Sequence, residues 1–302
     1  MHPLHLLLAV AVMAIWGLNF VVIRIGLDGM PPILLVALRF TLAALPAVFF
    51  VKRPNVKFAR IAHYGLVVFA LQFALLFGGM YLGLSAGLAA VVLQMHIFFT
   101  MLLAFALLRE RPTVFQLAGA VLGFLGVAII ALKQDVDAPT IGLAMVVLAA
   151  MAWAAGNMIG KQFGKVDMFA VVVWSSLAAP LPLFALSYMV EGPIAIARSL
   201  SNISLTSLLA LAYLVYLSTH FGFGAWTWLL NRYPASTVVP MTLLAPVFAM
   251  TASALVLGEK LPSWKLLAAA LVIAGLAINI FGGKVAAWRG RALGKAEPQE
   301  VK

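Results

Sequence analysis

Trp16 and Asn19 stand three residues apart in the apolar stretch AVMAIWGLNFVVIRIG, residues 11–26. Side chains three residues apart share one face of a helix, so an indole and a carboxamide would lie together there. An amide in apolar surroundings needs a polar partner, because an unpaired polar group is costly to bury. The pair therefore marks a place where a polar partner or a passing ligand meets the first helix.

The same pairing recurs in the second half of the chain. A shift of 138 residues aligns 11–26 with AAMAWAAGNMIGKQFG, residues 149–164, where Trp153 and Asn157 share a helix face. The identical positions pair Ala11, Met13, Ala14, Asn19 and Gly26 with Ala149, Met151, Ala152, Asn157 and Gly164. We interpret Trp16, Asn19, Trp153 and Asn157 as elements of one substrate pathway, near its opposite mouths.

A second similarity relates LLRERPTVFQLAGAVLGFLGVAII, residues 107–130, to VLGEKLPSWKLLAAALVIAGLAIN, residues 256–279. It pairs Glu110 with Glu259, and each glutamate shortly precedes an expected helix. A carboxylate at such a place faces the amides and the positive dipole end of a helix N-terminus. We interpret Glu110 and Glu259 as structural caps, with Thr113 or Ser263 also able to cap.

Arg39 is the permanent charge deepest in the expected second helix. A charged side chain at the centre of a bilayer costs about 2.5–3.5 kcal/mol on insertion scales, so it requires a partner. Its guanidinium could bind the carboxylate of an amino-acid-like substrate through its fork of donors. Alternatively, it could satisfy backbone carbonyls of a neighbouring broken helix or extend to the outer interface. The sequence leaves both alternatives open.

Further polar residues lie within apolar segments, and we assign Gln72, Gln94, His96, Tyr213, Tyr216 and His220 to the pathway. Such residues also occur as ordinary packing residues. The spacing of Tyr213, Tyr216, His220 and Phe223, by three, four and three residues, predicts one stripe along a helix. This stripe lies on the third helix of its half, and Gln72 lies at nearly the same place in the other half. The expected spans contain no Asp or Glu. If transport is coupled to protons, His96 or His220 would titrate; efflux down the substrate gradient is the alternative.

Prolines interrupt expected helices at Pro46 in the second span, Pro180 and Pro182 in the seventh, and Pro240 and Pro246 in the ninth. Proline bends a helix and frees carbonyl groups. Paired interruptions in matching helices therefore predict a hinge or gate.

Membrane-spanning helices must position these residues. The chain is 65% hydrophobic and 10% charged, with a mean hydropathy of +1.10, far from the values of soluble domains. Its apolar runs have about the 20 residues that cross a bilayer as a helix. We expect an all-α integral membrane protein with ten spans, at 4–26, 32–51, 62–82, 86–108, 113–132, 140–161, 168–190, 205–229, 235–257 and 263–282. The long apolar run of the first span differs from a signal peptide, so we expect it to be retained.

The net charge of +11 reflects orientation in the membrane rather than binding of nucleic acid. If the N-terminus is cytoplasmic, most Lys and Arg residues fall in cytoplasmic segments, at 52–60, 109–111, 161–165, 232 and after 283. This is the positive-inside distribution, so we expect both termini in the cytoplasm. The chain has no cysteine, which excludes disulfides and thiolate chemistry.

Several motifs give the chain a family resemblance: WGLNFVVIRIG, MPP at 30–32, LRF at 38–40, GLAAVVLQ at 87–94 and RER at 109–111. Nearly the full length resembles the EamA-type transporters of the drug/metabolite transporter superfamily. The resemblance implies two five-helix repeats in one chain. Five is an odd number, so the second repeat would be inverted in the membrane. We assign 1–137 and 138–283 to the repeats and 284–302 to a basic cytoplasmic tail.

The resemblance implies an exporter in a bacterial inner membrane, for amino acids such as cysteine and O-acetylserine. Aromatic amino acids or amphipathic drugs are the alternative substrates. An intramembrane enzyme is the alternative from another class, but the sequence has no G-x-S-x-G or H-E-x-x-H motif. We expect no cofactor and no metal site. The expected partners are a small-molecule substrate and the lipid bilayer; the oligomeric state stays open, and a monomer is compatible with the sequence.

Overall fold

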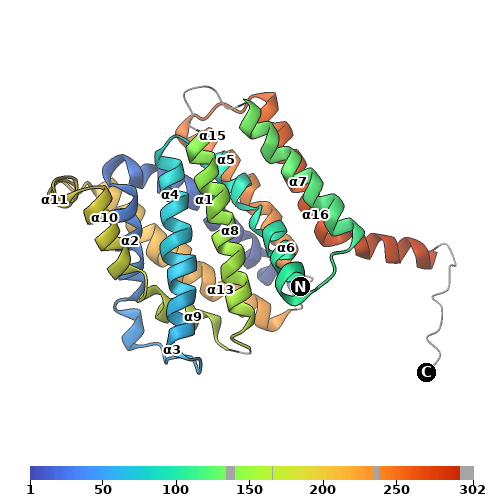
Figure 1. Ribbon diagram of the computed structural model, residues 1–302, viewed down its shortest axis with the longest axis horizontal. Helices are drawn as coiled ribbons and strands as arrows, with labels where there is room; N and C mark the ends of the chain where they lie inside the picture. Colours follow the sequence, from blue (N-terminus) through green and yellow to red (C-terminus); the bar gives the residue numbers. More distant parts are fainter. Residues whose placement is uncertain (134–139, 165, 234–237, 293–302) are drawn as a thin grey trace.

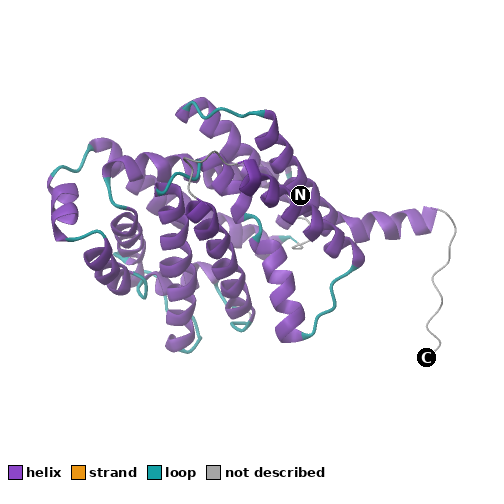
Figure 2. Cartoon of the chain, turned by 45° about the horizontal axis from the view of Figure 1, so that its top comes forward, coloured by secondary structure: helices purple, strands orange, loops and turns teal. Residues whose placement is uncertain are grey.

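The computed structural model describes residues 1–133, 140–164, 166–233 and 238–292, and these residues form helices and loops without a strand (Figure 2). The first half of the chain contains α1 (Pro3–Gly29), α2 (Pro32–Ala44), η1 (Ala47–Phe49), α3 (Phe58–Gly65), η2 (Leu66–Leu71), α4 (Gln72–Tyr81), α5 (Ala86–Leu93), α6 (His96–Leu108) and α7 (Val114–Lys133). The second half contains α8 (Thr140–Lys161), α9 (Met168–Ser176), α10 (Pro180–Val190), α11 (Pro193–Ser201), α12 (Leu205–Ala212), η3 (Tyr213–Phe221), α13 (Gly222–Arg232), η4 (Val239–Leu243), α15 (Leu244–Leu257) and α16 (Ser263–Ala292).

Eight helical segments of the described chain are long and apolar enough to cross a membrane, and nine are if α9 and α10 count as one bent span. The remaining expected span, at 235–257, is represented by the shorter apolar helix Met241–Leu257. Its expected start and the expected boundary between the halves at 137/138 lie outside the described residues. The all-α prediction is therefore confirmed for the described residues, and their apolar helices are consistent with a membrane protein. The ten spans and the inverted repeats stay predictions.

Several spans change their helix type part-way. The third span contains the π-helical segment η2 between α3 and α4, and the eighth contains η3 between α12 and α13. Pro180 begins α10, which is bent by 42° from α9. Pro46 lies where α2 gives way to the short 3₁₀ helix η1, and Pro246 lies in the first turn of α15. Pro240 is in η4, where the backbone alone is described.

The helices run between two faces of the bundle. The N-terminal face holds the start of α1, where His5 contacts Tyr233 after α13, and also the ends of α6 and α8. The far face holds the end of α1 and the starts of α2, α5 and α12. In the centre α1 packs against α15, α8 packs against α4 and α6, and α2 packs against α10.

Helices α7 and α16 form a separate pair at one edge of the molecule, and α11 lies at the opposite edge beside α10 (Figure 1). Gly119 and Gly275 let the pair pack closely, because a Cβ at Gly275 would lie 2.4 Å from the carbonyl oxygen of Gly119. Small residues allow this approach between membrane helices. Helix α16 continues to Ala292, so the segment expected to be a tail from residue 284 begins as helix.

Candidate functional site

Arg39 lies in the interior of the bundle and bonds to hydroxyl groups of η3. Its Nη2 donates to Thr219 Oγ1 at 3.2 Å and to Ser218 Oγ at 3.4 Å, and its Nε is 3.4 Å from Thr219 Oγ1. The guanidinium carbon lies 4.5 Å from the ring centre of Phe73 and 5.3 Å from that of Phe40. Arg39 is 1% exposed, so the guanidinium does not extend to either face.

The surroundings of Arg39 bind its cation only partly. Nη1 has no hydrogen-bond partner among the described residues, and the groups that contact the other nitrogens are neutral. Aromatic faces attract a guanidinium, but a buried charge without an opposite charge remains costly. Among the described residues that contact Arg39, none supplies the opposite charge.

The π-helical segment η3 presents the two hydroxyl groups to Arg39. Thr219 Oγ1 donates to the carbonyl of Leu214 at 2.8 Å, which leaves its lone pairs free to accept from Arg39. Helix α1 braces this segment from the other side: Trp16 Nε1 donates to the carbonyl of Ser218 at 3.1 Å, and Tyr213 Oη donates to the carbonyl of Ile15 at 2.8 Å. We call Trp16, Arg39, Tyr213, Ser218 and Thr219 the Arg39 cluster.

His220 connects this cluster with a cavity at the N-terminal face. Its Nε2 is 2.8 Å from the carbonyl of Ala43, one turn after Arg39 on α2, so Nε2 carries the proton of this bond. His220 also lines a cavity of about 620 Å³, together with Leu8, Asp167, Phe169, Phe221, Gly224, Ala225, Thr227 and Trp228. His220 thus lines the cavity and directly follows Thr219 of the Arg39 cluster in the sequence.

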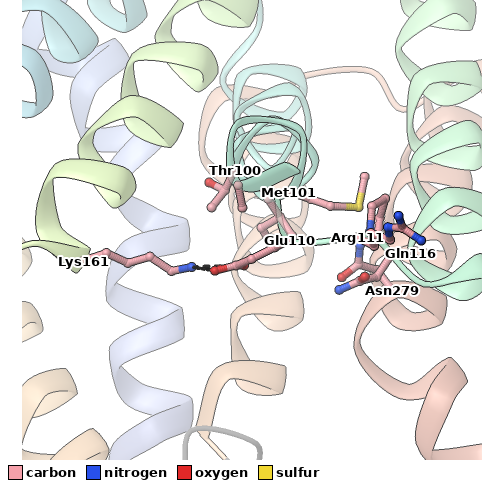
Figure 3. A pocket seen from close by; sticks show the side chains of 10 residues that line it. Thr100, Met101, Glu110, Arg111, Gln116, Lys161 and Asn279 are labelled. Atoms are coloured by element: carbon pink, nitrogen blue, oxygen red, sulfur yellow. Dashed lines mark hydrogen bonds and ion pairs between the residues drawn. The ribbon is translucent and has the colours of Figure 1, made fainter. Parts of the chain in front are cut away.

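A second group of predicted residues lies between α6 and α8. The rings of His96 and Trp153 stack at 4.2 Å with an angle of 10° between their planes, and Asn157 Nδ2 donates to Thr100 Oγ1 at 2.9 Å. Thr100 also lines a cavity of about 300 Å³ (Figure 3). In this view Lys161 reaches across to Glu110, at a distance of 3.0 Å, while Arg111, Gln116 and Asn279 lie on the opposite side.

The other predicted pathway residues are dispersed. Asn19 and Gln72 are buried, and Asn19 Oδ1 and Gln72 Nε2 have no partner among the described residues. Gln94 Nε2 lies 3.5 Å from the carbonyl of Thr242. Tyr216 is 55% exposed, and its ring centre lies 5.9 Å from that of His220. The structure therefore gathers the predicted residues into two groups and leaves these residues outside them.

The predicted caps bind different partners. Glu259 accepts the amide N–H groups of Ala86 and Gly87, at the start of α5 in the other half of the chain. Glu110 pairs with Lys161 instead of helix amides, and α7 is capped by Thr113, whose Oγ1 accepts from the amide of Gln116.

The model of the EamA-like transporter family matches residues 3–132 and again residues 140–281. The chain belongs to this family. Two similar proteins carry the name "Probable amino-acid metabolite efflux pump": the Salmonella typhimurium protein is 42% identical over 92% of this chain and 95% of its own, and the Escherichia coli protein is 39% identical over 91% and 94%. A solved structure shares the fold, with a TM-score of 0.62 and 18% identity over 92% of this chain and 96% of that chain.

For a transporter of the EamA-like family, the groups that matter are those that bind and release a substrate. Among the described residues, no cluster of three or more His, Asp or Glu side chains could hold a metal ion. The sequence patterns assigned no site role to Ser218, Thr219 or Glu191. Ser218 and Thr219 have no distinctive pattern, but Glu191 follows an expected span directly, as Glu110 and Glu259 nearly do. This shared position at the end of a span could have identified Glu191 as a further candidate for a helix cap.

Proposed function

We propose that this chain exports small metabolites that carry a carboxylate, with amino acids such as cysteine and O-acetylserine first, by alternating access across a bacterial inner membrane. Membership of the EamA-like transporter family and the names of the two similar proteins support export of amino-acid metabolites. The Arg39 cluster adds the chemical argument for the carboxylate.

The observation that carries the substrate class is the unbalanced charge of Arg39. Its guanidinium is buried, has neutral partners at 3.2–3.4 Å and keeps Nη1 unpaired among the described residues. A substrate carboxylate would supply the missing charge through a charge-assisted hydrogen bond. The bound anion would also offset part of the cost of burying the cation. A permanently cationic drug would be repelled at the same place, which disfavours that alternative substrate.

The substrate would enter from the N-terminal face, which we assign to the cytoplasm because of the positive-inside distribution of charge. It would first occupy the larger cavity and then pass His220 to reach Arg39. The cavity presents Phe169 and Trp228, and Phe73 lies over the guanidinium. These rings favour aromatic amino acids as a second substrate group within the same carboxylate class.

We also propose that residues 1–137 and 138–283 form two inverted five-span repeats, with α9 and α10 as one span and η4 and α15 as another. The double match of the family model supports this division. The packing supports it too, because α1 at the start of the first half packs on α15, and α8 at the start of the second packs on α6. Pro46, Pro180, Pro182, Pro240 and Pro246 would then act as hinge or gate positions at the breaks.

Together with Arg39, we assign to the pathway the other predicted residues: Trp16, Asn19, Gln72, Gln94, His96, Trp153, Asn157, Tyr213, Tyr216 and His220. His96 or His220 would carry protons if export is coupled to them, and facilitated efflux needs no such group. The chain could work as a monomer, because both repeats are present in it.

The test is counterflow in liposomes that contain the purified protein. We expect preloaded cysteine, O-acetylserine or tryptophan to accelerate uptake of labelled substrate, and the decarboxylated amines cysteamine and tryptamine to have no effect. Arg39→Gln should reduce exchange by roughly tenfold or more, since it removes a charge-assisted hydrogen bond. Arg24→Gln is the matched control, because the Arg24 side chain is 42% exposed and pairs with Asp28 at 3.5 Å.

Equal exchange of amines and amino acids would contradict the carboxylate assignment. Normal exchange by a folded Arg39→Gln protein would contradict it as well. Absence of counterflow with every amino acid, in a protein of normal stability, would remove the amino-acid substrates while the family remains.

A further inference from the structure

Two carboxylates tie the halves of the chain together at the far face. Glu191, at the end of α10, accepts the amide of Ile33 at 2.6 Å and the amide of Leu34 at 3.0 Å. Glu259, after α15, accepts the amide of Ala86 at 2.8 Å and the amide of Gly87 at 3.4 Å. Each carboxylate therefore spans two consecutive amides in the first turn of a helix.

The two contacts share their chemistry and their direction. In each, the acid comes from the second half and the amides from the first half. The first-turn amides of a helix have no partner within it, and the positive dipole end attracts an anion. Ser187 Oγ donates to Glu191 Oε2 at 2.5 Å and holds that carboxylate in place. Both glutamates are half-buried, whereas the four residues that donate are buried.

Close packing surrounds the contact made by Glu259. A Cβ added at Gly87 would lie 2.8 Å from Ser253 Oγ and 3.4 Å from both Glu259 Oε2 and the Cα of Met250. The glycine thus permits α5 to approach α15 until the carboxylate reaches the amides. Ser253 is fully buried beneath this contact.

At the N-terminal face, the corresponding contacts are of another kind. The start of α9 is capped by its own Asp167, whose Oδ1 accepts the amide of Phe169 at 2.9 Å. Glu110, the sequence match of Glu259, pairs with Lys161, and both side chains are about half exposed beside the smaller cavity. The strong contacts between carboxylates and helix amides thus join the halves at the far face.

We propose that Glu191 and Glu259 are gating residues that hold the far face closed, and that export requires both carboxylates to leave the amides of α2 and α5. Each is a positioning residue, because it acts on helix ends and not on the substrate. Release is reversible, since water can bond to the exposed amides in place of the carboxylate. Weakening either contact shifts the population toward the state that is open at the far face.

The test uses single cysteines, which the absence of natural cysteine makes specific. Ser253→Cys reports on the far face, and Met101→Cys, in the smaller cavity, reports on the N-terminal face. Each reporter is combined with Glu259→Gln, with Glu191→Gln and with both. The full chain is placed in nanodiscs, and the rate of labelling by a water-soluble maleimide is measured. Glu110→Gln is the matched control, with the same loss of charge at the other face.

We expect Glu259→Gln to raise the labelling rate of Ser253→Cys by roughly tenfold and to lower that of Met101→Cys, because one equilibrium governs both faces. Glu191→Gln should act in the same direction, and Glu110→Gln should not raise labelling at the far face. Unchanged labelling of Ser253→Cys in the double variant, with parent-like melting temperature and a single species on gel filtration, would overturn the proposal. A higher labelling rate of Ser253→Cys without a lower rate of Met101→Cys would also overturn it. The glutamates would then stabilise the far face alone and would not control the equilibrium between the two faces.

The inference rests on alternating access, which is part of the proposed function, but its test contains no substrate. If the carboxylate assignment of Arg39 fails in counterflow, the labelling result still decides the gate. If the labelling test fails while Arg39→Gln abolishes counterflow, the substrate class stands without this gate.

Discussion

The two faces of the bundle use the same residue type in different ways. At the far face, Glu259 bonds to buried backbone amides of the other half; at the N-terminal face, its sequence match Glu110 bonds to an exposed lysine beside a cavity. A carboxylate that replaces water at helix amides stabilises a closed contact, whereas an exposed ion pair contributes little. Matching positions in the two halves therefore have different functions in one conformation.

The largest effect is expected at Gly87. Gly87→Ala should force α5 away from α15, because the new Cβ would lie only 2.8 Å from Ser253 Oγ. Overpacking of this kind costs about 1–3 kcal/mol, and the amides of α5 would move away from Glu259. The melting temperature of the purified protein should fall.

Gly160→Ala is the matched control for this variant. Gly160 lies near the N-terminal face, and a Cβ there would meet the ring of Tyr64 at an ordinary distance of 3.8 Å. An equal loss of stability in both variants would show that the far face is no more tightly packed than the other.

A smaller effect is expected in the middle of the bundle, where α1 is bonded to η3. Trp16→Phe removes the donor to the Ser218 carbonyl, and Tyr213→Phe removes the donor to the Ile15 carbonyl. Each lost hydrogen bond should cost about 1 kcal/mol of stability. Since both bonds join the same two elements, the double variant should lose less than the sum. A melting series of the four proteins measures this coupling, and strict additivity would show that the two bonds act independently.

The sequence predicted the elements of the fold because its apolar runs have the length of a membrane span. It also predicted a break at Pro180, since proline cannot continue the hydrogen bonding of a helix. It did not predict the π-helical segments η2 and η3. These insert into spans whose composition is that of an ordinary apolar helix, so no residue type marks them. Yet η3 brings Ser218 and Thr219 to Arg39, so the partners of Arg39 were missed.

The sequence also did not predict the groups to which Glu110 and Glu259 bond. A carboxylate near a helix start suggests a cap, but which helix it caps depends on tertiary packing. Glu259 bonds to α5, which lies in the other half of the chain and begins at the far face only because of the topology. The same holds for Arg39: the sequence predicted that it lies deep within a span, but it did not predict its neutral hydrogen-bond partners. Local patterns thus identified the polar groups, and long-range packing determined what each one binds.

The smallest effect is expected for the ion pair of Glu110 and Lys161. Lys161 Nζ and Glu110 Oε1 are 3.0 Å apart, but the Glu110 side chain is 56% exposed and that of Lys161 is 49% exposed, so water and salt screen their attraction. A double-mutant cycle with Glu110→Gln and Lys161→Gln should give a coupling of about 0.2–1 kcal/mol at low salt. The coupling should decrease further in concentrated salt, because screening shortens the reach of exposed charges.

The loss of stability at the far face, measured for Glu259→Gln, should not depend on the salt concentration in this way, since the amide partners of Glu259 are buried and uncharged. A coupling between Glu110 and Lys161 as large as the Glu259→Gln effect, and equally insensitive to salt, would mean that both faces are held with equal strength, and the contrast between them would be lost.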